Sequence, residues 1–206
     1  MIEQQKKSVI ITFDLHGVIF ARDYKRIFFL VTKPRNIYLI IQHGAKPRFL
    51  KDSLILLFKK TKPAKMIYFY EQKYPRIAPL ILKIANSQKP LENTCLFLTE
   101  LQNQGFELHV FSNIGSIAYK DLAHTYPAIF KLFENCYVPS PENNFTAKPN
   151  MQAFTYYNAQ CNPDNKQVIF IDDKKENIKI ARSLKMHAIL FKTCADLQAQ
   201  LNHFFK

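Results

Sequence analysis

Short apolar runs alternate with stretches of helical periodicity along most of the chain. The apolar runs predict strands over residues 8–13, 106–111, 136–138, 167–171 and 187–191. Between and after them, helices are predicted from Pro90 to Gly105, over residues 116–124, 150–159 and 174–184, and from residue 195 onward. Because strands that alternate with helices pair in parallel, the predicted fold class is α/β, with a Rossmann-like, three-layer core around a parallel sheet.

Residues 20–90 have a different pattern. Aromatic and aliphatic clusters recur there at helical spacing and are interrupted by Pro34, Pro47, Pro63, Pro75 and Pro79. The segment is therefore predicted to be a helical cap subdomain, inserted into a core made of residues 1–19 and 91–206. Its aromatic residues are expected to form the core of the cap rather than to stack on nucleic-acid bases; examples are Phe28, Phe29, Tyr68, Phe69 and Tyr70.

The composition fits a globular protein. The chain has 206 residues, of which 48% are hydrophobic, and this is enough to bury a core. No apolar run approaches the roughly 20 residues of a membrane span, and residues 1–7 lack the features of a secretory signal. We therefore expect a cytoplasmic protein. The single, scattered cysteines are expected to be reduced thiols; they are Cys95, Cys136, Cys161 and Cys194.

The net charge of +13 is concentrated in the predicted cap. Residues 20–90 carry sixteen Lys and Arg against Asp23, Asp52 and Glu71, an excess equal to that of the whole chain. A solvated basic face explains this surplus, and so does binding of an anionic substrate, nucleic acid, or an acidic membrane or protein surface. Residues 51–60 similarly fit either an interfacial amphipathic helix or a helix packed in the cap. The oligomeric state is open.

Acidic residues stand at the ends of two predicted strands. Asp14 follows the first strand, and Asp172 and Asp173 follow the strand at residues 167–171. If both strands lie parallel in one sheet, the three carboxylates meet at the edge where open α/β sheets build their sites. Carboxylates so close repel one another, so they must bind a cation or share protons. Such a cluster is typical of a phosphoryl-transfer site.

Four motifs at strand ends together resemble the haloacid dehalogenase superfamily. They are FDLHGV at residues 13–18, FSN at 111–113, KP at 148–149 and FIDD at 170–173. The resemblance covers residues 8–19 and 91–195. Tyr126-Pro127, residues 137–140 and the spacing from Asp173 to Asn177 are similar to the branch that contains α-D-glucose-1-phosphate phosphatase and the amino-terminal phosphatase domain of soluble epoxide hydrolase. The fold of a response-regulator receiver is excluded, because receivers carry their pair of acidic residues after the first strand. Here the pair, Asp172 and Asp173, follows the fourth predicted strand.

The resemblance implies roles for the acidic residues. Asp14 would be the nucleophile that forms an aspartyl-phosphate. Mg²⁺ would be held by Asp14, the backbone carbonyl of His16 and Asp173, with Asp172 supporting it through water. The cap would be of the type inserted directly after the nucleophile loop, over the site, where it selects the substrate.

The resemblance also implies a phosphate site. Ser112 and the backbone of Asn113 would hold the transferring phosphoryl group, and Lys148 would balance its charge. Asn177 would fix the loop behind Asp173. The implied function is that of a Mg²⁺-dependent phosphatase, a phosphoric monoester hydrolase, acting on a small phosphorylated metabolite.

His16 departs from the pattern, because active phosphatases of the superfamily usually carry an aspartate there. With a pKa of about 6.5, histidine can protonate a leaving group and activate water. Activity without its help and a weakened enzyme are the other interpretations. The alternative function is therefore a binding or regulatory module that keeps the fold and engages an anionic partner through the basic cap.

Overall fold

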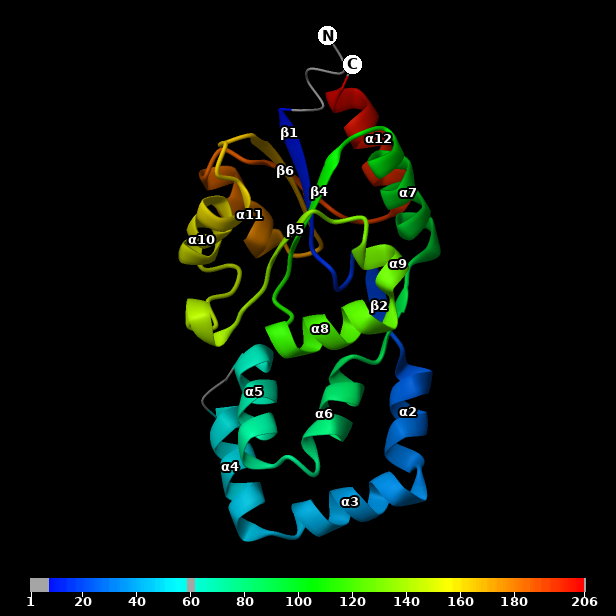
Figure 1. Cartoon of the computed structure of the whole chain (residues 1–206), viewed down its shortest axis with the longest axis vertical. Coiled ribbons are helices and arrows are strands. Elements are labelled where there is room, and N and C mark those ends of the chain that lie inside the picture. Colours follow the sequence, from blue (N-terminus) through cyan, green and yellow to red (C-terminus); the bar gives the residue numbers. More distant parts are fainter. Residues whose placement is uncertain (1–7, 59–61, 206) are drawn as a thin grey trace.

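The computed structural model describes residues 8–58 and 62–205. Parts of the predicted segments lie outside the described residues: residues 1–7 and 206 of the core, and residues 59–61, which include the end of the amphipathic segment 51–60. Within the described part, the chain folds into an α/β core and an elongated helical cap joined at one end of the core (Figure 1).

A five-stranded parallel sheet forms the centre of the core. Its strands are β1 (Val9–Phe13), β4 (Glu107–Phe111), β5 (Asn135–Tyr137), β6 (Gln167–Asp172) and β7 (His187–Leu190). They lie in the order β5-β4-β1-β6-β7, with Phe13 opposite Val110 on one side and Ile171 on the other. All neighbouring strands are parallel, which confirms the predicted α/β class. The carboxyl ends of β1, β4 and β6 consequently meet at one edge.

Helices cover both faces of the sheet. They are α7 (Glu92–Asn103), α8 (Ser116–Thr125), α9 (Pro127–Phe130), α10 (Met151–Cys161), α11 (Lys175–Ser183) and α12 (Cys194–Phe204). Figure 1 shows α10 and α11 on one side of the sheet and α7 and α12 on the other. Alternate strand residues serve the two sides: Ile169 packs in the cluster with Leu98 of α7, whereas Phe170 packs in the cluster with Phe154 of α10.

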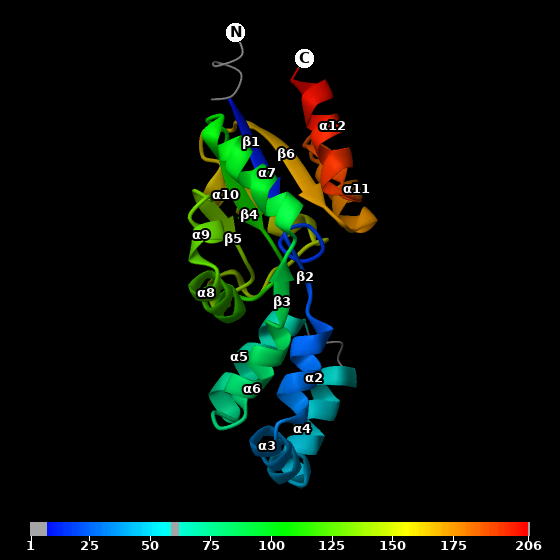
Figure 2. The ribbon, with the colours of Figure 1, turned by 90° about the vertical axis from the view of Figure 1, so that its right-hand side faces the viewer.

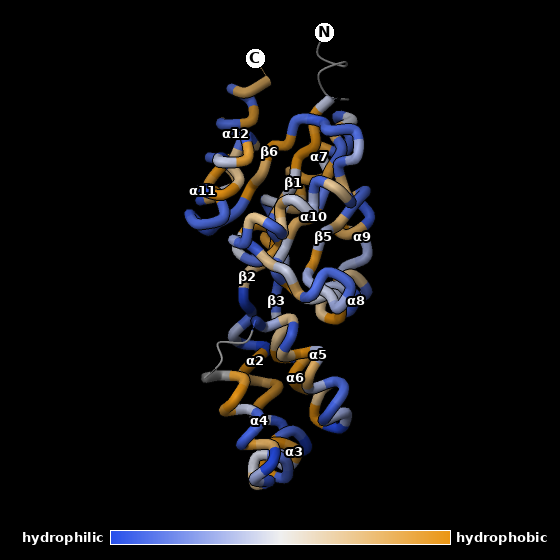
Figure 3. The backbone as a smooth tube through the Cα atoms, turned by 90° about the vertical axis from the view of Figure 1, so that its left-hand side faces the viewer, coloured by the Kyte–Doolittle hydropathy of each residue, from blue (hydrophilic) through white to orange (hydrophobic). Residues whose placement is uncertain are grey.

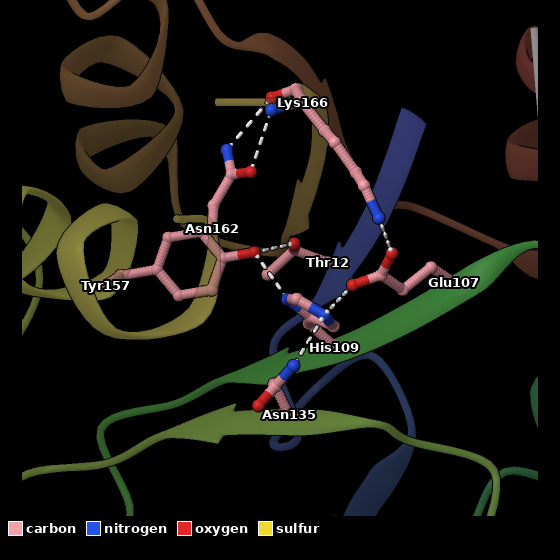
Figure 4. A network of polar contacts seen from close by, with 7 residues as sticks. All are labelled: Thr12, Glu107, His109, Asn135, Tyr157, Asn162 and Lys166. Carbon is pink, nitrogen blue, oxygen red and sulfur yellow. Dashed lines mark hydrogen bonds and ion pairs between the residues drawn. The ribbon is translucent and has the colours of Figure 1, made fainter. Parts of the chain in front are cut away.

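A polar network fastens α10 to the sheet (Figure 4). The Tyr157 hydroxyl lies 2.6 Å from the Thr12 hydroxyl and 3.0 Å from His109 Nδ1. Nε2 of His109 is 2.8 Å from Glu107, whose other oxygen accepts from Lys166. Burial lowers the pKa of His109, so its ring is neutral at pH 7, with Nε2–H donating to Glu107 and Nδ1 accepting from Tyr157.

The described part of the cap consists of five helices. They are α2 (Tyr24–Thr32), α3 (Pro34–Gly44), α4 (Pro47–Phe58), α5 (Pro63–Lys73) and α6 (Ala78–Ala85). Pro34, Pro47 and Pro63 each begin a helix, because the first helical residue needs no hydrogen-bonded N–H. No helix among residues 8–58 and 62–205 combines the length and apolar content that crossing a bilayer requires.

A two-stranded ribbon, which the sequence analysis missed, joins the cap to the core. β2 (Phe20–Arg22) pairs antiparallel with β3 (Gln88–Pro90), so the chain enters and leaves the cap at adjacent points (Figure 2). The predicted boundaries at residues 19/20 and 90/91 coincide with the outer ends of this ribbon. The cap also touches the core through α5, which packs against α8.

The predicted core of the cap is only partly correct. Tyr70 is buried and packs against Phe49 and Tyr74. Phe28 and Phe29, by contrast, are 68% and 59% exposed, so the expectation that they lie inside the cap is wrong. The physical reason is that α2 packs mainly against α3 and α6, and no residue of this helix is buried.

Candidate active site

The parallel pairing of β1 with β6 brings the predicted carboxylates together. The backbone N–H of Asp14 donates to the carbonyl of Ile171 at 2.9 Å, which aligns the two strand ends. One carboxylate oxygen from each of Asp14, Asp172 and Asp173 lies within 4.8 Å of the others. Asp14 and Asp172 are buried, so their charges require nearby compensation.

Lys148 supplies a positive charge to this cluster. Its Nζ donates to Asp172 Oδ2 at 2.6 Å and to the backbone carbonyl of Phe111 at 2.5 Å, and lies 3.2 Å from Asp14 Oδ1. The side chain is almost completely buried, with 3% of the residue exposed. One ammonium group therefore bridges the carboxylate predicted to attack phosphorus and its neighbour on β6.

The carboxylate of Asp172 also accepts hydrogen bonds from α11 and from the residue before that helix. Asn177 Nδ2 lies 2.9 Å from both of its oxygens, and the backbone N–H of Lys174 donates to Oδ1 at 2.9 Å. Burial raises the pKa of the Asp172 carboxyl, an effect that Lys148 opposes and Asp14 reinforces. Asn177 was predicted to fix the loop behind Asp173. In the structure its side chain, in the first turn of α11, contacts Asp172 at the end of β6.

Gly17 brings the loop after β1 against Asp173. Its φ of +88° lies in the left-handed region, and a Cβ at this position would be 2.5 Å from Asp173 Oδ2. The glycine thus allows the turn after Asp14 to approach the carboxylate at the end of β6. The backbone at Gly17 therefore lies beside Asp173. These are the two segments that are predicted to hold the metal together.

His16 contacts the ribbon that leads into the cap. Its Nδ1 lies 3.0 Å from Gln88 Oε1 on β3. Since an amide oxygen only accepts, Nδ1 carries the proton of this hydrogen bond and Nε2 remains for proton exchange. Gln88 was not predicted as a partner of His16, because it stands 72 positions away in a segment with a helical pattern.

Ser112 and Asn113 follow β4, as predicted, and Asn113 is tied to the loop of Lys148. Its Oδ1 accepts from the backbone N–H of Lys148, and its Nδ2 donates to the carbonyl of the same residue, both at 2.8 Å. Ser112 is buried, and its backbone N–H donates to Tyr137. The Asn113 side chain therefore positions Lys148, which is a role that the sequence analysis did not assign.

Solved structures resemble the fold of the chain, whereas no family model and no curated protein matches it. A haloacid dehalogenase family enzyme from Bacteroides thetaiotaomicron superposes with a TM-score of 0.62 at 20% identity, covering 89% of this chain and 93% of that one. L-2-haloacid dehalogenase from Xanthobacter autotrophicus gives 0.56 at 12% identity, with coverages of 87% and 75%. This chain has the haloacid dehalogenase fold. A hydrolase from Streptococcus pneumoniae agrees, with a TM-score of 0.56, 16% identity and coverages of 94% and 97%.

A cavity of about 250 Å³ lies between the haloacid dehalogenase core and the cap. Asp14, His16, Ser112, Asn113 and Asn177 are the predicted site residues that line it. The cap and ribbon contribute Arg22, Ala64, Ile67, Asn86 and Gln88, none of which the sequence analysis had singled out. Lys148, Asp172 and Asp173 do not line this cavity. The predicted nucleophile thus lines the cavity, whereas the three charged residues around it do not.

The chemistry of the donor set suits Mg²⁺. All three clustered side chains are carboxylates, and oxygen ligands are those that this hard cation selects. Asp14, Asp173 and the carbonyl of His16 are the groups that would hold the ion. The ammonium of Lys148 compensates only part of the negative charge of the cluster, which leaves a net attraction for a cation.

Proposed function

We propose that the protein is a Mg²⁺-dependent phosphatase that hydrolyses a small phosphorylated metabolite through an aspartyl-phosphate on Asp14. The observation that carries this proposal is the position of Asp14, which lines the cavity and lies 3.2 Å from Lys148 Nζ within a cluster of three carboxylates. The fold supports it too, since the Bacteroides thetaiotaomicron enzyme has been crystallised with magnesium and inorganic phosphate.

In the proposed reaction, a carboxylate oxygen of Asp14 attacks the phosphorus atom and the ester oxygen leaves. Ser112 and the backbone of Asn113 orient the phosphoryl group, and Lys148 compensates the charge that gathers around Asp14. Bound Mg²⁺ supplies further neutralisation of the phosphate oxygens. Water then attacks the aspartyl-phosphate, which releases inorganic phosphate and restores the carboxylate.

His16 is proposed to exchange the proton. With Nδ1 held by Gln88, Nε2 donates a proton to the leaving oxygen and later accepts one from the attacking water. The hydrogen bond to Gln88 would fix the orientation of the ring. Substituting His16 by Asp and by Ala tests this role: Ala should remove one limb of the pH–rate profile, and Asp should retain it at a lower pH.

Asn86, on the cap side of the cavity, is held in place by its amide: Nδ2 donates to the carbonyl of Ala118 and to Asp121 Oδ2, both at 2.8 Å. Membership in the branch of α-D-glucose-1-phosphate phosphatase and the phosphatase domain of soluble epoxide hydrolase is part of the proposal.

Substitution of Asp14 by Asn tests the function. It should reduce the hydrolysis of para-nitrophenyl phosphate by about 10³-fold or more, because an amide is a poor nucleophile. Asp164→Asn, which changes an exposed acid, is the matched control and should retain activity. Undiminished turnover by Asp14→Asn, or wild-type turnover that persists in EDTA, would contradict the proposal. Phosphate binding by a wild type that lacks turnover would instead favour the binding module.

A further inference from the structure

Large hydrophobic side chains are exposed on the cap to an unusual degree. Among the described residues, all the exposed large hydrophobic side chains except Leu96 and Met151 lie on α2, α3 and α4; they are Tyr24, Phe28, Phe29, Ile37, Tyr38, Ile40, Ile41, Leu50, Leu54 and Ile55. We call these residues the apolar cap face. Folded monomers rarely leave so many such side chains in one region without a binding role.

The spacing of these residues gives each helix an apolar side. Tyr24 and Phe28, Ile37 and Ile41, and Leu50 and Leu54 are pairs four residues apart, so the members of each pair lie on the same side of their helix. No residue of α2 is buried, and His43 is the buried residue of α3. Figure 3 shows hydrophobic positions along α2 and α4 among hydrophilic ones.

Positive charges accompany the apolar cap face. The same three helices and their connections carry Lys25, Arg26, Lys33, Arg35, Lys46, Arg48 and Lys51. Asp52, the acidic residue of α4, is engaged by Lys73 at 2.5 Å and by the Tyr74 hydroxyl at 2.6 Å. Asp23, at the N-cap of α2, accepts from the backbone N–H of Arg26, and the basic side chains of α2 and α3 form no ion pair with a carboxylate of the described residues.

A groove in the cap gathers four of the basic residues of the cap. It has a volume of about 360 Å³, and its cationic lining residues are Lys33, Arg35, Arg76 and Lys83. None of them forms an ion pair with a carboxylate of the described residues. Leu30 and Leu39 also line this groove, so it combines apolar walls with positive charge. A phosphate group bound there would relieve the repulsion among the four cations.

We propose that the apolar cap face binds an anionic lipid surface. Its aromatic and aliphatic side chains enter the headgroup region, while basic residues beside them contact lipid phosphates; Lys33 is an example, because its Nζ lies 4.2 Å from the centre of the Phe29 ring. Charge complementarity argues against a second copy of this chain, whose cap carries the same positive charge. Nucleic acid would satisfy the charges, but it offers nothing to aliphatic side chains such as Ile37 and Ile41.

The position of the face is compatible with a working core. In Figures 1 and 2, α3 lies at the end of the molecule far from the sheet, whereas the cavity with Asp14 lies where cap and core meet. The part of the apolar cap face on α3 therefore lies far from the cavity, whereas Tyr24, at the start of α2, lies next to the ribbon. Binding to lipid does not depend on the proposed function and is measured without a substrate.

Co-sedimentation with vesicles tests the proposal. The full chain should bind phosphatidylcholine vesicles containing phosphatidylglycerol about tenfold or more tighter than pure phosphatidylcholine vesicles. Phe28→Ser combined with Ile41→Ser should weaken binding about tenfold, since two inserted side chains are lost. The matched control is Leu96→Ser combined with Met151→Ser, which removes the exposed hydrophobic residues of the core and should leave binding unchanged.

A second pair of variants separates charge from insertion. Lys33→Gln with Arg35→Gln should weaken binding to the anionic vesicles about tenfold. Lys131→Gln with Lys179→Gln, a matched loss of two exposed lysines of the core, should have little effect. Circular dichroism and thermal melting would establish that every variant is folded.

Four results would overturn the proposal: equal binding to both vesicle types, no binding at all, equal loss in the cap and control variants, or concentration-dependent self-association that is lost in Phe28→Ser with Ile41→Ser. Binding to single-stranded RNA that displaces the protein from vesicles and is insensitive to the serine substitutions would assign the face to nucleic acid instead.

Discussion

The core and the cap differ in how far their charged and apolar side chains are buried and paired. At the sheet edge, the buried Lys148 ammonium is paired with Asp172 and the buried Asn177 amide holds the same carboxylate. In the cap, Phe28 and Ile41 are exposed, and lysines such as Lys83 are exposed without an ion pair. The core therefore fixes each functional group through specific partners, whereas the outer helices of the cap present their side chains to whatever binds them.

The core and the cap depend on each other at the ribbon and at the contact between α5 and α8. The ribbon brings Gln88 to His16, and α5 packs on α8 where Gly115 leaves room for Ala64. A Cβ on Gly115 would lie 2.7 Å from the Cβ of Ala64, so the contact is close. The outer helices α2, α3 and α4 can thus vary their surface without disturbing the site, while changes at the ribbon reach it directly.

Removing a buried charge partner from the core should have the largest effect. Lys148→Met leaves Asp14 and Asp172 buried without their cation and should lower the free energy of unfolding by about 3–5 kcal/mol, in addition to abolishing turnover. Lys83→Met in the cap makes the same chemical change at an exposed position and should alter stability by no more than about 0.5 kcal/mol. Urea denaturation measures both, and similar losses would contradict the contrast between core and cap.

The arrangement of the core could be predicted from sequence because its signals are local. Apolar runs such as residues 167–171 mark strands buried on both faces, and alternation with helices implies parallel pairing. Once Asp14 and Asp172 were placed at strand ends, their approach followed from the topology. Gly105, predicted to end a helix, indeed has a φ of +85° after α7.

The remainder depends on contacts that leave no periodic pattern. β2 and β3 are three residues long, and Gln88-Lys89-Pro90 shows neither alternation nor β-branched residues, so the ribbon and the partner of His16 were missed. The exposure of Phe28 and Phe29 was missed for another reason. Helical spacing identifies an apolar side but not whether another helix covers it.

The two parts should also differ in their tolerance of an added methyl group. Gly17→Ala is expected to cost about 2 kcal/mol or more, because it combines a positive φ with a clash against Asp173. Gly44→Ala, at the end of α3 with nothing within 4 Å of the added Cβ, should be neutral or stabilising.

Gly105→Ala separates strain from the clash in Gly17→Ala. Its φ of +85° is equally unfavourable, yet no atom lies within 4 Å of the new Cβ, so it should cost only about 1 kcal/mol. Thermal unfolding of the three variants gives the comparison. If Gly17→Ala loses no more stability than Gly105→Ala, the Asp173 side chain moves away from the added methyl group without a cost in stability. If Asp173 is displaced, Gly17→Ala should also need more Mg²⁺ for half-maximal phosphatase activity.

The buried network of the core should also make stability depend on pH. Burial lowers the pKa of His109 below 6.5, so the unfolded chain binds the proton more readily than the folded one. The free energy of unfolding should therefore fall as the pH drops below about 6.5, by at most about 1.4 kcal/mol per pH unit for this group. Burial also lowers the pKa of His187, so this residue should likewise make the free energy of unfolding fall as the pH drops.

Urea denaturation between pH 7.5 and 5.5 isolates the contribution of His109. His109→Gln should flatten this dependence, because glutamine keeps polar contacts with Glu107 and Tyr157 but does not titrate. His124→Gln, an exposed control, should retain the wild-type slope. If His109→Gln also retained it, the pH dependence would lie elsewhere, and the network that fastens α10 to the sheet would take up a proton at little cost to folding.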